Sequence, residues 1–178
     1  MASAKTAEPS HLAVATTFES CFPDVEMCGG ASEPLYTPPQ GIQPARLHYR
    51  EDFAASALHE AAHWCIAGTA RRQQVDFGYV YLAMPRTTAQ QTQFFAAEVR
   101  TQCLEALFAA ACGIKFQPSA DNLEADLDGF IDALKEQQTP TRIWVITRAG
   151  HRARTFVQAL AKLGGRDKDF WENADWIK

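Results

Sequence analysis

Residues 57–68 read Ala57-Leu58-His59-Glu60-Ala61-Ala62-His63-Trp64-Cys65-Ile66-Ala67-Gly68. Alanine and leucine favour helix, and apolar residues surround the polar ones, so this segment is predicted to form a buried helix. His59 and His63 are four residues apart and share one helix face, where both imidazoles can reach a single metal ion. The segment therefore predicts a metal site on a helix in the centre of the fold.

A third protein ligand is expected, because zinc and iron sites in enzymes rarely use two histidines alone and also keep a position open. In metzincins this ligand is a histidine six residues after the second one, but Thr69 occupies that position, and Ile66 replaces the required glycine. The remaining histidines are far away in the sequence and are predicted to lie at the surface: His11, His48 and His151.

A carboxylate from the next long helix is the natural candidate for the third ligand. Apolar spacing predicts this helix from about Thr88 to Cys112, ended by Gly113. Glu98 and Glu105 lie on nearly the same face of it, and apolar residues flank both. The residues alone leave the choice between the two open, and either side chain could instead face solvent.

The role of Glu60 is also open. It could act as the general base of a hydrolytic zinc site, or it could orient a ligand without contacting the metal. The residues after the helix, including Arg71, Arg72, Asp76 and Tyr79, could line a cleft beside the metal. An equally good interpretation is a charged helix exit followed by an ordinary strand.

Other local patterns predict the remaining elements of the N-terminal half. Apolar spacing after the capping residue Ser10 predicts a helix to Phe22, and the proline- and glycine-rich residues 23–44 predict an irregular connection. Residues 46–50 alternate as in a short strand, and Asp52 is a candidate N-cap for the histidine-bearing helix, which should run to about Gly68. Aromatic and β-branched residues predict a further strand over 75–81.

Three shorter helices are expected in the C-terminal half. A capping-box variant at Asp121–Glu124 predicts a helix to about Glu136, and Thr139-Pro140 predicts the start of another, with Ile143, Trp144 and Ile146 facing inward. A last helix carries Phe156, Val157 and Leu160 and ends before Gly164. The tail beyond it is mostly polar apart from Trp171 and Trp176, and we expect it to be loosely held.

Length and composition indicate one soluble domain, with 178 residues and 47% hydrophobic content. We expect the domain to span residues 10–165, with a flexible N-terminus (1–9) and a C-terminal tail (166–178). A net charge of −4 argues against direct nucleic-acid binding through a large basic surface. No signal peptide or membrane span is recognisable, and five cysteines without a C-x-x-C pair indicate reduced thiols, so a cytoplasmic location is expected.

Several segments together resemble the elongation factor P hydroxylase family. The matching residues are His59–Gly68, Ala70–Arg72, Val75–Tyr79, Cys21-Phe22, Glu33-Pro34, Tyr36, Gln93-Phe94, Glu98-Val99, Gln102 and Asp121–Glu124 with Asp126. The resemblance covers roughly residues 18–163, which is nearly the whole chain.

This resemblance implies an enzyme that uses molecular oxygen and non-haem Fe(II) to hydroxylate the modified lysine of elongation factor P. It implies that His59, His63 and Glu98 bind the metal, in an α+β domain with a helix-rich, small-sheet fold similar to that of a metal-dependent endoribonuclease family. The metal site would lie between two core helices. Asp121 joins Arg71, Arg72, Asp76 and Tyr79 as a candidate for contacting the substrate.

Two other functions remain as alternatives from the residues. One is a zinc-dependent hydrolase, either a peptidase or a nuclease, with Glu60 as its general base. The other is a binding module in which the metal only stabilises the fold. The H-x-D pattern of 2-oxoglutarate oxygenases is not recognisable, so that cosubstrate is not predicted.

Overall fold

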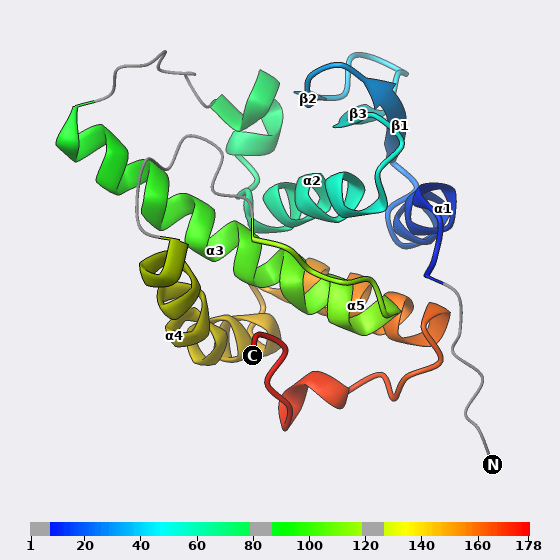
Figure 1. Ribbon diagram of the computed structural model, residues 1–178. Coiled ribbons are helices and arrows are strands. Elements are labelled where there is room, and N and C mark those ends of the chain that lie inside the picture. The colour runs from blue at the N-terminus through cyan, green and yellow to red at the C-terminus, as the bar shows by residue number, and fades with distance from the viewer. Residues whose placement is uncertain (1–7, 79–86, 119–126) are drawn as a thin grey trace.

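A computed structural model of the protein describes residues 8–78, 87–118 and 127–178. These residues form five α-helices and three β-strands (Figure 1), and no helix among them is long and apolar enough to cross a membrane. Of the predicted flexible N-terminus, residues 1–7 lie outside the described residues. In chain order the elements are α1 (His11–Cys21), β1 (Val25–Ala31), β2 (Leu35–Thr37), β3 (Ala45–Arg50), α2 (Ala54–Ile66), α3 (Thr88–Cys112), α4 (Leu127–Ile146) and α5 (His151–Leu163).

The three strands form one mixed sheet in the order β1-β3-β2. Strand β3 pairs in parallel with β1, where Met27 lies opposite Leu47, and antiparallel with β2. The prediction of a strand near residues 46–50 is confirmed, whereas the prediction of an irregular connection over 23–44 is wrong, because β1 and β2 lie within it. Alternate residues of β1 and β3 are buried, so this sheet has one core-facing side.

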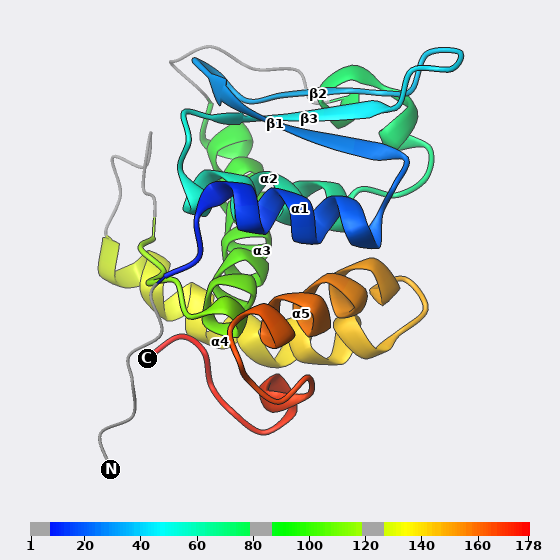
Figure 2. The ribbon, with the colours of Figure 1, turned by 90° about the vertical axis from the view of Figure 1, so that its right-hand side faces the viewer.

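The elements stack in layers that Figure 2 shows from the side. The sheet forms the top layer, and α1 and α2 lie beneath it, with α4 and α5 below these helices. Helix α3 runs across the layers and contacts α2, α4 and α5. The predicted α+β class, helix-rich with a small sheet, is therefore confirmed.

The predicted N-terminal helices are present, with one difference at a cap. The Ser10 hydroxyl accepts a hydrogen bond from the backbone N–H of Ala13, so Ser10 caps α1 as expected. The prediction of Asp52 as the N-cap of α2 is wrong: Phe53 is the capping residue and gives no side-chain hydrogen bond. The Asp52 carboxylate instead lies 3.5 Å from Nδ1 of His11, which connects it to α1.

No strand forms at residues 75–78, contrary to the prediction of a strand over 75–81. Short 3-10 helices at Arg71–Gln73 and Val75–Gly78 follow α2, and positions 79–81 lie outside the described residues. Asp76, Phe77 and Gly78 have positive φ angles of 47°, 56° and 70°, a conformation incompatible with a strand. The Phe77 ring stacks on Tyr36 of β2 at 4.2 Å between centroids, and this packing contact favours the turn over the local strand preference.

Helices α3 and α5 agree with the predictions, but the two helices expected on either side of Thr139-Pro140 are one. Helix α3 ends at Gly113 in the left-handed conformation (φ 81°), and α5 ends before Gly164. Helix α4 continues through Pro140 without a break, and the predicted capping box at Asp121–Glu124 lies outside the described residues.

The predicted inward face of α4 is wrong at two of three positions. Ile143 and Ile146 are exposed, whereas Thr141 and Val145 are buried, because the continuous helix keeps its phase across Pro140. Among the remaining histidines, His151 is exposed as predicted. His11 and His48 are partly exposed, and His11 hydrogen-bonds to the Tyr49 hydroxyl at 2.8 Å.

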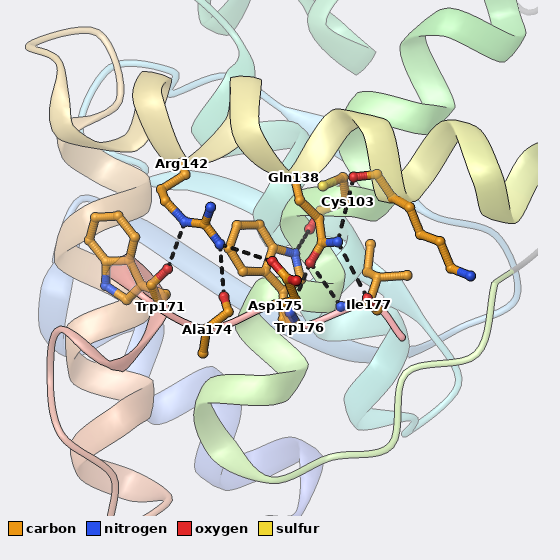
Figure 3. A network of polar contacts seen from close by, with 9 residues as sticks. Cys103, Gln138, Arg142, Trp171, Ala174, Asp175, Trp176 and Ile177 are labelled. Atoms are coloured by element: carbon orange, nitrogen blue, oxygen red, sulfur yellow. Dashed lines mark hydrogen bonds and ion pairs between the residues drawn. The ribbon is translucent and has the colours of Figure 1, made fainter.

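The C-terminal residues pack against the helices, although the sequence predicts a loosely held tail. Trp171 is fully buried, and the Arg142 side chain donates to the carbonyl oxygens of Trp171 and Ala174 (Figure 3). The Gln138 amide accepts hydrogen bonds from the backbone N–H groups of Trp176 and Ile177. Two side chains of α4 therefore hold this segment in place.

Candidate metal centre

Helices α2 and α3 bring two histidines and a glutamate together. His59 and His63 lie one turn apart on α2, with 3.1 Å between their Nε2 atoms. The Glu98 carboxylate of α3 lies 3.9 Å from Nε2 of His59 and 3.7 Å from Nε2 of His63. One candidate ligand atom from each residue lies within 4.8 Å of the others. The site thus lies between two core helices, as expected.

Small residues on α2 allow the neighbouring elements to approach this helix closely. Ala57, Ala61 and Ala62 are completely buried, and α2 contacts the sheet as well as α1, α3 and α5. Because the histidines follow the i, i+4 spacing, they leave the helix on the same side, toward α3. The spacing within α2 therefore positions His59 and His63, whereas the packing of α3 against α2 positions Glu98.

Two further polar residues of α3 orient this group. Nδ1 of His59 lies 2.8 Å from the Glu105 carboxylate, and the Gln102 amide donates to Glu98 at 3.3 Å. The two glutamates left open by the sequence therefore have different positions: Glu98 faces the Nε2 atoms of both histidines, and Glu105 lies at the Nδ1 side of His59. The orienting role of Gln102 was not predicted from the sequence. Its signal was the spacing of Glu98, Gln102 and Glu105 at i, i+4 and i+7 on one face of α3.

The charges of the two histidines differ. Burial alone would lower the pKa of His59, but the hydrogen bond and negative charge of Glu105 raise it to about 10. The pKa of His63 is lowered by burial and by the positive charges of His59 and Arg71. A protonated His59 can therefore donate from Nδ1 to Glu105 and from Nε2 to the neutral His63. A metal ion held by His59 and His63 would displace this proton, because metal-binding imidazoles are neutral.

Glu60 is buried beside these ligand candidates. Its side chain is on the same helix as His59, and burial raises its pKa to about 7, with the negative charge of Glu98 acting in the same direction. It forms no hydrogen bond or ion pair with another described residue in the structure. The geometry is compatible with both interpretations of Glu60 from the sequence.

The candidate substrate-binding residues fall into two groups. Arg71, Arg72 and Asp76 lie in the 3-10 helices after α2, while Tyr79 and Asp121 lie outside the described residues. Nε of Arg71 donates to the Phe77 carbonyl, and the Asp76 carboxylate accepts from the backbone N–H of Tyr36. These contacts stabilise the turn, and a role of these residues in substrate binding stays a prediction.

The donor set suits a divalent transition metal. Two imidazole nitrogens and one carboxylate can bind zinc, iron or a similar ion, and three protein ligands leave coordination positions open. The hydrogen bond from His59 to Glu105 is the arrangement that commonly orients a metal-binding imidazole. The residues present therefore fit a site for a divalent metal ion.

Comparisons with known proteins identify the family to which this chain is similar. The family model for elongation factor P hydroxylase matches residues 15–172. A Haemophilus influenzae protein named elongation factor P lysine hydroxylase is 35% identical over 159 residues, which cover 85% of this chain and 88% of the relative. The matched region includes both histidines and Glu98.

Proposed function

Because this chain belongs to the elongation factor P hydroxylase family, we propose that it hydroxylates the modified lysine of elongation factor P. The convergence of His59, His63 and Glu98 in a member of this family carries the proposal. The substrate is then a side chain presented by a folded protein, and the site of action is the cytoplasm. Neither a membrane nor a nucleic acid takes part directly.

We propose His59, His63 and Glu98 as ligands of a divalent metal ion, with Fe(II) as the resident metal and zinc as the alternative. When bound, iron in a set of two histidines and one carboxylate supplies the activation of molecular oxygen needed to hydroxylate a C–H bond. Three protein ligands would leave coordination positions of the ion open, so that oxygen and the substrate side chain could approach.

The surrounding side chains prepare this site. Glu105 fixes the ring orientation of His59 and keeps its Nε2 toward the metal position, and Gln102 does the same for the Glu98 carboxylate. Glu60 adds a further buried carboxyl group. This concentration of acidic groups favours a cationic substrate side chain such as a lysine derivative.

We propose that the segment after α2 contacts the surface of elongation factor P around the modified lysine. Arg71, Arg72, Asp76 and Tyr79 would contact elongation factor P near the lysine, and Asp121 would do so from the connection before α4. The positive charge of Arg71 lowers the pKa of His63, one of the proposed metal ligands.

The test follows the oxygen atom. Iron-loaded protein is incubated with modified elongation factor P, a reductant and ¹⁸O₂, and the lysine-containing peptide is analysed by mass spectrometry. We expect the peptide to gain the mass of one labelled oxygen atom, and the matched variants His63→Ala and Glu98→Ala to give no gain. An unchanged peptide with iron-loaded wild-type protein would contradict the proposal.

A metal-dependent hydrolase is the second candidate, because the Glu60 pKa of about 7 suits a general base acting on water. This function requires no oxygen. Turnover of a peptide or nucleic-acid substrate by zinc-loaded protein under anaerobic conditions, lost in Glu60→Gln, would support it. Oxygen-dependent labelling of the lysine peptide would decide against it.

A further inference from the structure

A pair of arginines lies at the C-terminal end of α2, apart from the histidines. The guanidinium groups of Arg72 and Arg152 lie over the indole ring of Trp64, at 5.4 Å and 5.0 Å from its centroid. Both groups also donate to the Ala67 carbonyl oxygen, each at 2.6 Å. Residues 80 positions apart in the chain are thereby brought to the same point.

The two positive charges have no acidic partner in the described part of the chain. Neither arginine forms an ion pair with a carboxylate there, and the Tyr36 hydroxyl donates to the Arg72 carbonyl beside them. The nearby sequence is equally poor in acids, since residues 61–75 and 137–166 contain no Asp or Glu. Two adjacent like charges repel, and an anion bound to both would remove this repulsion.

The hydrogen bonds to the end of α2 use only part of the donors. Each guanidinium has five N–H groups, and the Cys65 and Ala67 carbonyls engage one nitrogen of each arginine. Nε of Arg152 is buried and has no hydrogen-bond partner among the described residues, and the same holds for Nε1 of Trp64. Arg72, Arg152 and Trp64 therefore have N–H groups free to donate, and a ligand with several acceptor oxygens could bind them.

We propose that Arg72 and Arg152 bind an oxyanion, a phosphate or carboxylate group, at the C-terminal end of α2. Arginine forks match the oxygens of both groups, and the Trp64 ring holds the two forks in position. Both side chains are partly exposed, so a ligand can reach them. Anion binding at this pair requires neither a bound metal nor the hydroxylation reaction, although Arg72 is also a candidate for contacting the substrate.

Calorimetric titration of metal-free protein tests the site, with inorganic phosphate in one arm and acetate in the other. We expect saturable binding of one anion per chain. The double variant Arg72→Lys and Arg152→Lys keeps both charges but loses the planar forks, and should bind roughly tenfold more weakly or worse. Arg148→Lys, an exposed arginine between α4 and α5, is the matched control and should bind like the wild type.

The two arms identify the source of the oxyanion: saturation by phosphate indicates a phosphate group, and saturation by acetate alone indicates a carboxylate. Binding of neither anion, or equal binding by the double variant, overturns the proposal. If the double variant does not fold, a phosphate-soaked crystal of the wild type decides. Density for the anion between the two guanidinium groups supports the site, and water alone refutes it.

Discussion

At the scale of single residues, two glutamates of α3 lie near the same histidine with different consequences. Glu98 faces the Nε2 atoms of both His59 and His63, whereas Glu105 contacts only Nδ1 of the His59 ring. A carboxylate behind an imidazole fixes the ring and its tautomer, so that the other nitrogen faces the metal. Glu98 and Glu105 should therefore affect metal binding by different mechanisms.

We predict that Glu105→Gln weakens metal binding by about 10–100-fold while leaving the fold intact. The amide has nearly the same shape as the carboxylate, but it lacks the negative charge that polarises His59. Calorimetric titration with Fe(II) under anaerobic conditions measures the change. Glu136→Gln, on the exposed side of α4, serves as the control. Equal affinities for Glu105→Gln and wild type would show that Glu105 does not position the histidine.

The sequence predicts the ligands unequally well. His59 and His63 follow from helix geometry alone, because their spacing is local. The choice between Glu98 and Glu105 depends on how α3 crosses α2, and residues seven positions apart on a helix have almost the same direction. Only the resemblance to a known family favoured Glu98 in advance, and the helix packing then gives both residues a position.

At the scale of elements, the predictions succeed where the signal is local and fail where a distant contact decides. Ser10 and Gly113 mark helix ends by their own chemistry, and both are confirmed. Strand β1 contains Gly29 and Gly30, which hide its strand pattern, and it is stabilised by pairing with β3. At residues 75–78 a strand was predicted but none forms. The packing of Phe77 on Tyr36 stabilises a turn there, despite the strand-like composition.

The C-terminal segment packs against the helices, although the sequence predicts a loosely held tail. We predict that Trp171→Ala lowers the free energy of unfolding by about 3–5 kcal/mol. The Trp171 ring is fully buried in the main hydrophobic core, so its removal leaves a large cavity. Urea denaturation followed by circular dichroism measures the loss. Lys168→Ala, three residues earlier and exposed, should change the stability little. A change of similar size in both variants would contradict the packing of this segment.

At the scale of the whole molecule, burial sorts the cysteines into two classes. Cys65, Cys103 and Cys112 are buried, and burial raises the pKa of Cys65 to about 12 and of the other two to about 11. Cys21 and Cys28 are only half-buried.

We predict that iodoacetamide at neutral pH alkylates Cys21 and Cys28 of the native protein first, because thiolates react and buried thiols stay protonated. Peptide mass spectrometry after short exposure identifies the modified positions. In urea all five cysteines should react, which shows that folding provides the protection. Alkylation of Cys65 as fast as Cys28 in the native protein would mean that the α2 layer opens more readily than its packing implies.

We predict that a bound metal stabilises the folded protein but is not required for folding. Leu58 of α2 and Leu104 and Leu107 of α3 belong to the same hydrophobic core, which joins the two helices without an ion. Metal-free protein should keep its helical circular dichroism and unfold cooperatively at a lower temperature. Free metal at a hundred times its Kd stabilises the folded state by about 2.7 kcal/mol. Thermal scans of stripped and reloaded protein measure this shift, which His63→Ala should lack. A stripped protein without helical signal would instead identify the metal as part of the folding core.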